Sequence, residues 1–171
     1  MAFIRSFGKH TPKIAPDVFV ADSATIIGQV EIGAQSSIWY QAVLRGDVGG
    51  IVIGQRSNIQ DAAILHCTTG RTPCVVGNDI VVGHRAILHG CRIENEVLIG
   101  MGAIVLDEVV VPSHTIIAAG ALVPEGKKLQ AGFLYAGIPA KPIKPLSPQQ
   151  IMMIKMGAAH YVENGQTHSQ L

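Results

Sequence analysis

The chain has 171 residues and a formal net charge of +1, so it is long enough for one domain with a sizeable core. The near-neutral charge gives no electrostatic basis for binding nucleic acid or an anionic membrane surface, and no apolar run reaches the ~18 residues of a membrane-spanning helix. Hydrophobic residues make up 48% of the chain, but only four are Phe, three Tyr and one Trp. The apolar content is therefore mostly Ile, Val, Leu and Ala, which favours strands that bury small, uniform layers.

The beginning of the chain and its cysteines bear on the cellular compartment. The first residues, MAFIRSFGKHTPKIAP, lack the apolar block and the small-residue cleavage site of a secretion signal. Cys67, Cys74 and Cys91 are odd in number and form no CxxC pair, so we interpret them as small apolar residues. We therefore expect a reduced, cytoplasmic protein.

From Ile14 to Val123 an aliphatic residue returns at every sixth position, with three breaks in phase. The first break is a slip of three residues, the second is a slip of five, and the third is a single step of five. The repeat positions are Ile14, Val20, Ile26, Ile32, Ile38, Leu44, Ile53, Ile59, Leu65, Val76, Val82, Leu88, Ile93, Ile99, Val105, Val111, Ile117 and Val123.

A six-residue period is typical of a parallel β-helix, in which each hexapeptide forms one short strand and one corner, and three hexapeptides form a triangular coil. The pattern therefore predicts an all-β solenoid of about six coils. Gly follows several repeat positions, such as Ile53 and Ile99, and we expect these small residues to let the backbone turn. The alternative is a β-sandwich with chance regularity, but sandwich strands alternate with period two and their loops vary in length.

The two phase slips are predicted to be loops, one near RGDVGG (residues 45–50) and one within HCTTGRTPC (66–74), and such loops often carry function. The Pro-rich segment 133–146 predicts an extended strap that completes a β-helix domain over residues 1–146. Ser147 and Pro148 favour the start of a helix over 147–165, which is predicted to pack one apolar face on the prism. Gly165 is predicted to end this helix, leaving a frayed tail over 166–171.

Indexing the polar residues to the repeat brings distant side chains together. His66 and His89 each directly follow a repeat position and are 23 residues apart, which is one coil of 18 plus the five-residue insertion. Arg45 also follows a repeat position and lies one coil earlier, once the three-residue insertion is subtracted. These three residues are therefore predicted to stack in one column, with neighbours about 4.8 Å apart along the prism.

Asp61 and His84 form a second column, on a different face of the prism, with Gln60 beside it. Each lies two residues past a repeat position, and they are also 23 residues apart. The alternative explanation for these histidines is scattered surface polarity. The remaining histidines share no column with these and are expected to be solvated: His10, His114, His160 and His168.

Two stacked imidazoles are a partial metal site, because catalytic zinc takes three protein ligands and a water. His84 of the same chain faces elsewhere, whereas His84 of a neighbouring copy could reach the pair if two prisms packed side by side. A heterologous contact of this kind closes into a ring, and three triangular prisms around a threefold axis are the natural closure. The same packing would set Arg45 against Asp61 of the neighbour as a charge pair.

The ordered set RGD (45–47), NIQD (58–61), His66, GH (83–84) and HG (89–90) resembles the γ-class carbonic anhydrases and their bacterial relatives. The resemblance covers nearly the whole chain, including GIPAK (137–141) and the C-terminal helix, although hexapeptide acyltransferases also carry GIPAK. It implies a left-handed β-helix and a homotrimer with zinc at each subunit interface, with ferrous iron or cobalt as alternative metals.

The resemblance also implies the reaction and the metal ligands. His66 and His89 of one subunit and His84 of the next would bind zinc, and Gln60 would hydrogen-bond the metal-bound water. The implied reaction is the reversible hydration of carbon dioxide to bicarbonate by attack of zinc hydroxide, which exists at neutral pH because zinc lowers the pKa of its water to ~7.

Four further residues take part by the same resemblance. Arg45 and Asp61 would form the intersubunit pair, and Asp47 would support that network. Tyr135 resembles an aromatic residue near the metal. Asn58 matches the motif without an assigned role.

The chain departs from the best-characterised family members in its acidic and amide residues. They have Glu just after the Arg-x-Asp motif, where this chain has Val48, and another Glu in the loop after the first histidine as proton shuttle. The loop CTTGRTPC (67–74) is short and has no acid, and Gly137 replaces an Asn. Metal binding is therefore better supported than fast hydration of carbon dioxide.

Two other classes of function are compatible with the sequence. One is an acyltransferase or thioesterase acting on acyl-CoA, and the other is a non-catalytic, metal-stabilised trimeric scaffold. A hexapeptide acyltransferase needs one histidine base and a pantetheine groove, usually under a large loop. The set of three histidines with Gln60 disfavours the acyltransferase, but a thioesterase built on the same metal site is harder to exclude.

Overall fold

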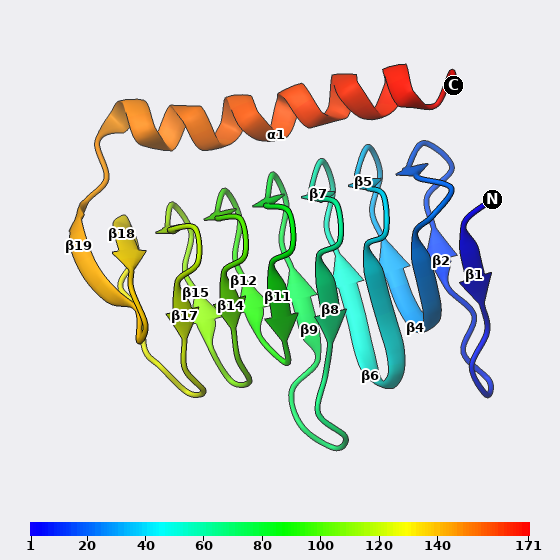
Figure 1. Cartoon of the computed structure of the whole chain (residues 1–171), viewed down its shortest axis with the longest axis horizontal. Helices are drawn as coiled ribbons and strands as arrows, with labels where there is room; N and C mark the ends of the chain where they lie inside the picture. The colour runs from blue at the N-terminus through cyan, green and yellow to red at the C-terminus, as the bar shows by residue number, and fades with distance from the viewer.

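The structure, a computed structural model, describes all 171 residues as a long three-sided prism of stacked coils with one helix along its side (Figure 1). The first strands are β1 (Phe3–Arg5), β2 (Lys13–Ile14), β3 (Phe19–Val20), β4 (Thr25–Ile32), β5 (Ser37–Ile38) and β6 (Val43–Ile53). The middle strands are β7 (Asn58–Ile59), β8 (Ile64–His66), β9 (Cys74–Val76), β10 (Val81–Val82), β11 (Ile87–His89) and β12 (Arg92–Ile93). The last elements are β13 (Leu98–Ile99), β14 (Ile104–Val105), β15 (Val110–Val111), β16 (Ile116–Ile117), β17 (Leu122–Val123), β18 (Phe133–Ala136), β19 (Lys141–Pro145) and α1 (Pro148–His168).

Parallel pairing between successive coils gives the prism its three faces. The first face contains β1, β8, β11, β14, β17 and the first halves of β4 and β6. The second face contains β2, β9, β12, β15 and the second halves of β4 and β6. The third face runs from β3 through β5, β7, β10, β13 and β16 to β18 and β19. The fold is the left-handed parallel β-helix with a C-terminal helix that the hexapeptide pattern and the family resemblance predict.

The aliphatic repeat positions fill the interior in the predicted register. Ile26, for example, pairs with Leu44, Leu44 with Leu65, and Leu65 with Leu88, so both corrections for the insertions are confirmed. All repeat positions from Ile26 to Val123 are buried, whereas Ile14 and Val20 in the terminal coil are half-buried. Each coil therefore covers the apolar layer of the coil before it. Truncating a side chain in one of these layers would leave a cavity.

The corners use the glycines differently from the prediction. Three residues before nine of the repeat positions, the backbone enters the left-handed region at a non-glycine residue, such as Gln35 (φ 58°) and Ala62 (φ 56°), and at three more corners Gly90, Gly102 and Gly120 take this position. Gly54, which follows a repeat position, has no positive φ, but a Cβ there would lie 2.5 Å from the carbonyl oxygen of Gly77 in the next coil. A glycine that follows a repeat position, as Gly54 does, is thus needed for the close approach of successive coils and not for the turn.

The first phase slip is a strand and not the predicted loop. Residues 45–50 lie within β6, which bends around one corner of the prism as a single strand (Figure 1). It stays hydrogen-bonded because β4 runs beside it through the same bend, with Arg45 and Gly46 paired to Ile27 and Gly28. The second slip is a loop, as predicted, and residues 67–73 project beyond the other corners.

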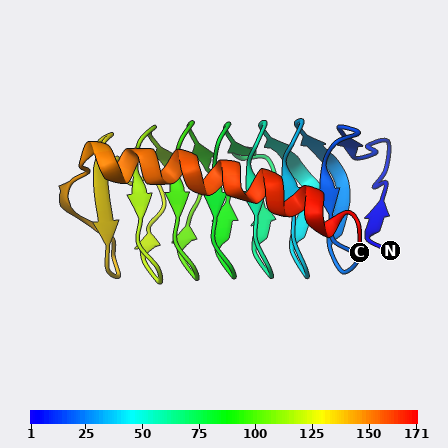
Figure 2. The same cartoon turned by 90° about the horizontal axis from the view of Figure 1, so that it is seen from above.

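The helix α1 lies along the third face and runs back toward the N-terminal end of the prism (Figure 2). Ser147 caps it and forms a capping box with Gln150, as its position favours. The predicted end at Gly165 is wrong, because the helix continues to His168 and only 169–171 form the tail. Gly165 is buried, and a Cβ there would lie 3.2 Å from Cβ of Phe19, so glycine lets the helix pack closely on β3.

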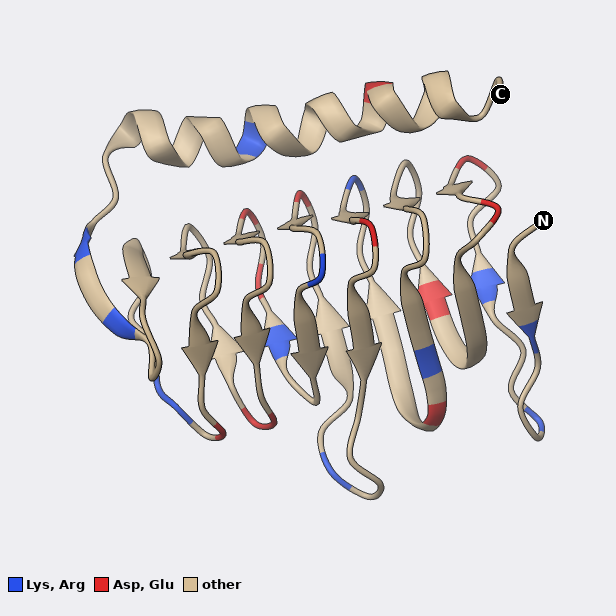
Figure 3. Ribbon diagram, in the orientation of Figure 1, with Lys and Arg blue, Asp and Glu red and all other residues tan.

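The strap ends the third face. β18 and β19 form an antiparallel pair, and β19, which contains two lysines and two prolines, is exposed along its whole length. The helix lacks the length of apolar sequence that crossing a bilayer requires. Residues of both charges are spread along the strands and corners of the prism (Figure 3).

The histidines outside the two columns are not all solvated, in contrast to the prediction. The ring of His168 is half-buried against Phe19, Trp39 and Tyr40, and its Nδ1 lies 3.0 Å from the Tyr40 hydroxyl. His114 is exposed, as predicted, and its Nε2 lies 2.7 Å from a carboxylate oxygen of Glu96. His10 is half-buried, whereas His160 is exposed, as predicted.

The three cysteines are free and buried, in agreement with their interpretation as small apolar residues. Burial raises the pKa of the Cys67 thiol to about 11. A thiol with so high a pKa is almost entirely protonated at neutral pH and is therefore a poor nucleophile.

Candidate metal centre

The first face carries the predicted histidine column on two adjacent strands. His66 ends β8 and His89 ends β11, and the two residues pair directly in the parallel ladder. Their ring centroids are 5.2 Å apart, close to the expected spacing of one coil. Nδ1 of His66 and Nε2 of His89 face each other at 3.2 Å.

A carboxylate holds each of these rings from the far side. Nε2 of His66 lies 3.1 Å from Oδ1 of Asp47, whose other oxygen accepts a hydrogen bond of 2.5 Å from Arg45. Nδ1 of His89 lies 2.7 Å from Oδ2 of Asp107 in the following coil. The five side chains form a continuous ladder along one edge of the prism.

Hydrogen bonds keep both carboxylates ionised. Burial would raise the pKa of Asp47, but the hydrogen bonds with Arg45 and His66 outweigh it and hold the pKa below its ordinary value. Burial opposes ionisation of Asp107 in the same way, and His89 with the neighbouring Thr68 hydroxyl holds that pKa low as well. Both side chains are therefore acceptors at neutral pH.

The protonation pattern leaves two lone pairs facing each other. An ionised carboxylate only accepts hydrogen bonds, so the neutral tautomers that satisfy both carboxylates have their protons on Nε2 of His66 and Nδ1 of His89. The facing nitrogens, 3.2 Å apart, are then both acceptors. Two nitrogens bound tetrahedrally to one zinc at ~2.0–2.1 Å are separated by about 3.3–3.4 Å, so the pair matches two ligands of one such ion.

His84 lies at a different edge, on the corner after β10. Its Nδ1 is 2.7 Å from Oδ2 of Asp61, which confirms the predicted second column and leaves Nε2 free. Both side chains are about 40% exposed, and they line a shallow hollow with Gln41, Arg85 and Met101. Within one chain, no three His, Cys, Asp or Glu side chains converge on a point, so His84 does not join the other two histidines.

Gln60 is buried beside the second column, and the structure shows what holds it. Its amide donates to Oδ1 of Asn58 at 2.9 Å, and the amide of Asn58 donates to the carbonyl of Ile80. Asn58 therefore positions Gln60 through a buried amide pair, a contact that the sequence motif does not reveal. Gln60 makes no hydrogen bond to any of the three histidines in this chain.

Tyr135 lies in the interior of the prism and not against the histidine pair of its own chain. It occupies the repeat position of β18, stacked on Ile117, and is only 3% exposed. Its hydroxyl accepts a hydrogen bond of 2.7 Å from the backbone N–H of Gln130. Within this chain it therefore packs as a core residue.

Asp107 is the site residue that the sequence reasoning missed. Val105 pairs with Leu88 in the neighbouring coil, and Asp107 lies two residues past Val105. Asp107 is therefore at a corner of the coil that follows the coil of His89. The histidine column reaches the residue directly after Val105 when it is extended by one coil. A search for acidic residues at the next position along the chain would have found Asp107. Polar side chains at corners are easily overlooked, because the repeat itself places only the strand residues.

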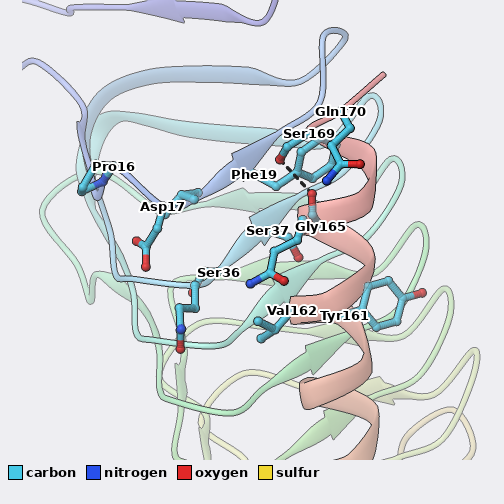
Figure 4. Close-up of a pocket in the computed structure, with 13 residues that line it drawn as sticks. Pro16, Asp17, Phe19, Ser36, Ser37, Tyr161, Val162, Gly165, Ser169 and Gln170 are labelled. Atoms are coloured by element: carbon cyan, nitrogen blue, oxygen red, sulfur yellow. Dashed lines mark hydrogen bonds between the residues drawn. The ribbon is translucent and has the colours of Figure 1, made fainter.

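A separate hollow lies where the C-terminal half of α1 meets the first coils (Figure 4). Ser36, Ser37, Tyr161 and Gln166 are among the residues that line it. Both serine hydroxyls are already engaged, with Gly54 and Trp39 respectively. It shares no residue with the histidine column.

Known proteins resemble this chain over most of its length. It is 43% identical over 161 residues to a carbonic anhydrase of Geobacillus kaustophilus, covering 94% of this chain and 88% of that protein. A protein of Methanocaldococcus jannaschii named as a probable carbonic anhydrase is 42% identical, with 90% of this chain and 96% of that protein covered. The chain belongs to the γ-class carbonic anhydrase family.

Longer members of the family occur in plants. The mitochondrial γ-carbonic anhydrase 2 of Arabidopsis thaliana is 42% identical over 93% of this chain, which spans 59% of the length of that protein. No family model matches the chain.

Solved structures show the same architecture under other names. A Bacillus cereus protein described as a candidate acetyltransferase superposes with a TM-score of 0.96 at 41% identity, covering 99% of this chain and 98% of that one. A hexapeptide transferase family protein from Anaplasma phagocytophilum gives a TM-score of 0.92 at 37% identity, with coverage of 96% and 97%.

Proposed function

We propose that this chain is a zinc-dependent carbonic anhydrase that forms homotrimers and hydrates carbon dioxide reversibly at sites between subunits. The observation that carries the proposal is the pair of ring nitrogens of His66 and His89, which face each other at 3.2 Å while the other nitrogen of each ring lies on a carboxylate. Membership of the γ-class carbonic anhydrase family supports the same reaction. Because the plant relatives are much longer, their full activity and partners are not transferred to this chain.

His66 and His89 of one subunit and His84 of the next would hold the metal. The fit rests on three imidazoles, each of which has one nitrogen on a carboxylate and would offer the other to the metal, as ligand histidines usually do. When bound, zinc supplies a Lewis acid that brings the pKa of water close to 7, and ferrous iron or cobalt are the alternative ions.

The remaining site residues are proposed to orient the reacting water and the ligand histidines. Gln60 would hydrogen-bond the reacting water, and its hydrogen bond with Asn58 holds its amide in place. Arg45 and Asp47 hold the His66 ring, and in the trimer Arg45 is proposed to meet Asp61 of the next subunit. Tyr135 is proposed as the aromatic residue near the metal, by its match to the family pattern, and it is buried within its own chain.

Proton removal is the step that the chain equips least. The loop 67–73 has no acid and is instead tied down by Arg71, which binds Glu108 and Glu125 on two later corners. Those glutamates are engaged with a cation and are poor candidates for a mobile shuttle. We therefore propose a turnover limited by proton transfer, which added small buffers such as imidazole should accelerate.

Metal analysis followed by a hydration assay tests the proposal. Protein purified without oxygen should carry close to one zinc or iron per chain, and carbon dioxide hydration should rise with the concentration of imidazole buffer. Removing the metal with a chelator should abolish hydration, and adding zinc back should restore it. Stoichiometric metal without any hydration would leave a metal-stabilised scaffold as the function.

Mixing two inactive variants tests the interface. His84→Ala and His66→Ala chains should each fold and each fail to bind stoichiometric zinc as homotrimers. After subunit exchange at equal amounts, random assembly should restore about a quarter of the sites, because one complete site needs one chain of each kind in the right order. No recovery after verified exchange would refute the shared site.

The second candidate is an acyltransferase or thioesterase acting on acyl-CoA. The specific observation in its favour is the close structural match to two proteins described as transferases. An acyltransferase would need one histidine as base and no metal. Acyl-CoA turnover that survives complete removal of metal, with no hydration of carbon dioxide, would favour this candidate.

A further inference from the structure

Asp107 is less exposed than any other carboxylate that pairs with a cationic group or a histidine in this structure. Its side chain is only 9% exposed, while the His89 ring that it binds is 27% exposed. One oxygen accepts from His89 at 2.7 Å, and the other, Oδ1, is buried without a hydrogen bond. A fold that needed only a neutral contact here would not bury half of a carboxylate unsatisfied.

The backbone around Asp107 is arranged to admit it. Gly90, directly after His89, has φ +52°, and a Cβ there would lie 2.2 Å from Oδ1 of Asp107. The Gly90 carbonyl also accepts a hydrogen bond of 2.6 Å from Thr72, at the end of the loop 67–73. Glycine at this corner therefore opens the space for the carboxylate, and the loop holds that corner in place.

We propose that Asp107 is a positioning residue that fixes the proton of His89 on Nδ1, so that Nε2 points its lone pair at the metal. This inference rests on the metal site of the proposed function. Asp107 mirrors Asp47, which does the same for His66 from the coil on the other side. The two carboxylates hold the histidine pair from both ends, so that the facing nitrogens of His66 and His89 would both be available to bind a metal.

Asp107→Asn tests the role with almost no change of shape. The amide can either accept from Nδ1 or donate to it, so the ring is free to adopt the other tautomer with its proton on Nε2. We expect zinc affinity, measured by competition with a chromogenic chelator, to fall by about 10–100-fold. The far-ultraviolet circular dichroism and the trimer mass should be unchanged.

Glu96→Gln is the matched control. Glu96 forms a carboxylate–histidine pair of the same 2.7 Å length, with His114, away from the histidine column. Removing that charge should leave zinc affinity unchanged. Equal loss of affinity in both variants would show a general effect of charge and would overturn the inference.

The nitrogen-15 spectrum of the histidine rings provides a second readout that needs neither the variant nor activity. In the metal-free wild-type protein, the His89 ring should show its proton on Nδ1, and Asp107→Asn should populate both tautomers. A wild-type ring protonated on Nε2, or zinc affinity within twofold of wild type in Asp107→Asn, would overturn the inference.

These outcomes separate the inference from the proposed function. If wild-type protein binds zinc but does not hydrate carbon dioxide, the proposed function fails. The ratio of zinc affinities between wild type and Asp107→Asn still tests the role of Asp107. If it binds no metal, the proposed function fails and the tautomer of His89 in the metal-free protein decides the inference alone.

Discussion

Two groups of histidines on the same prism show different outcomes for the same side chain. On the helix side, His168 packs among aromatic rings with its Nδ1 on the Tyr40 hydroxyl, and His114 pairs with Glu96. On the first face, His66 and His89 also have one nitrogen satisfied, by Asp47 and Asp107. What differs is the second nitrogen.

The second nitrogens of His66 and His89 face each other, whereas those of His114 and His168 face no other histidine. A histidine with one partner is an ordinary structural residue, and two of them become a candidate metal site only when their free lone pairs converge. The number of histidines in a sequence is therefore a weaker signal than the register that sets which nitrogens meet.

Trp39→Ala should have the largest effect on stability. It should disrupt the packing of α1 on the third face and leave the histidine column intact. Trp39 is 5% exposed, packs on Phe19, Tyr161 and His168, and donates to Ser37. Its loss should lower the free energy of unfolding by about 3–5 kcal/mol in urea denaturation, with zinc affinity unchanged. Met152→Ala, on the exposed side of the same helix, should change stability by less than ~0.5 kcal/mol.

His89→Ala and His168→Ala should separate the two groups. His89→Ala removes one metal ligand and should weaken zinc binding by at least about 100-fold, or about 2.7 kcal/mol. His168→Ala should leave zinc binding intact and cost about 1 kcal/mol of stability through the lost hydrogen bond. Chelator competition and urea denaturation on the same samples measure both, and similar effects of the two variants on zinc would contradict the distinction.

Acid should weaken the helix side through Glu96, with the smallest effect. Burial would raise the pKa of Glu96, but hydrogen bonds with Lys155 on the helix and with His114 hold it below the ordinary 4.5. A carboxyl whose pKa is lowered by folding stabilises the protein above 4.5 and loses this contribution as the pH falls through the folded value. The stability difference between wild type and Glu96→Gln should therefore shrink between pH 6 and pH 3, measured by thermal denaturation at ~0.15 M salt. A difference that stays constant would contradict the assignment.

The sequence predicted those parts of the fold that the six-residue period controls. Stacking of Leu44, Leu65 and Leu88 follows from counting, and so does the pairing of His66 with His89. Apolar periodicity is a strong signal because a one-residue error would turn every core side chain outward.

Features that depend on neighbouring coils were not predictable from the period. Residues 45–50 read as a loop because the phase slips, yet β4 pairs with them through the bend and keeps them a strand. Gly165 resembles a helix terminator but is a packing contact with Phe19. Asp107 was missed for the same reason, because its role depends on contact with the preceding coil.

The pairing of β18 with β19 bears on how the stack of coils ends. A parallel solenoid is open at its last coil, where unpaired N–H and C=O groups could accept a further chain and extend the stack into a fibre. The strap turns back on itself and places Pro142 and Pro145 in the outermost strand, with Lys141 and Lys144 beside them. Proline has no N–H to donate and lysine charges repel a like partner, so this edge is a poor template for polymerisation.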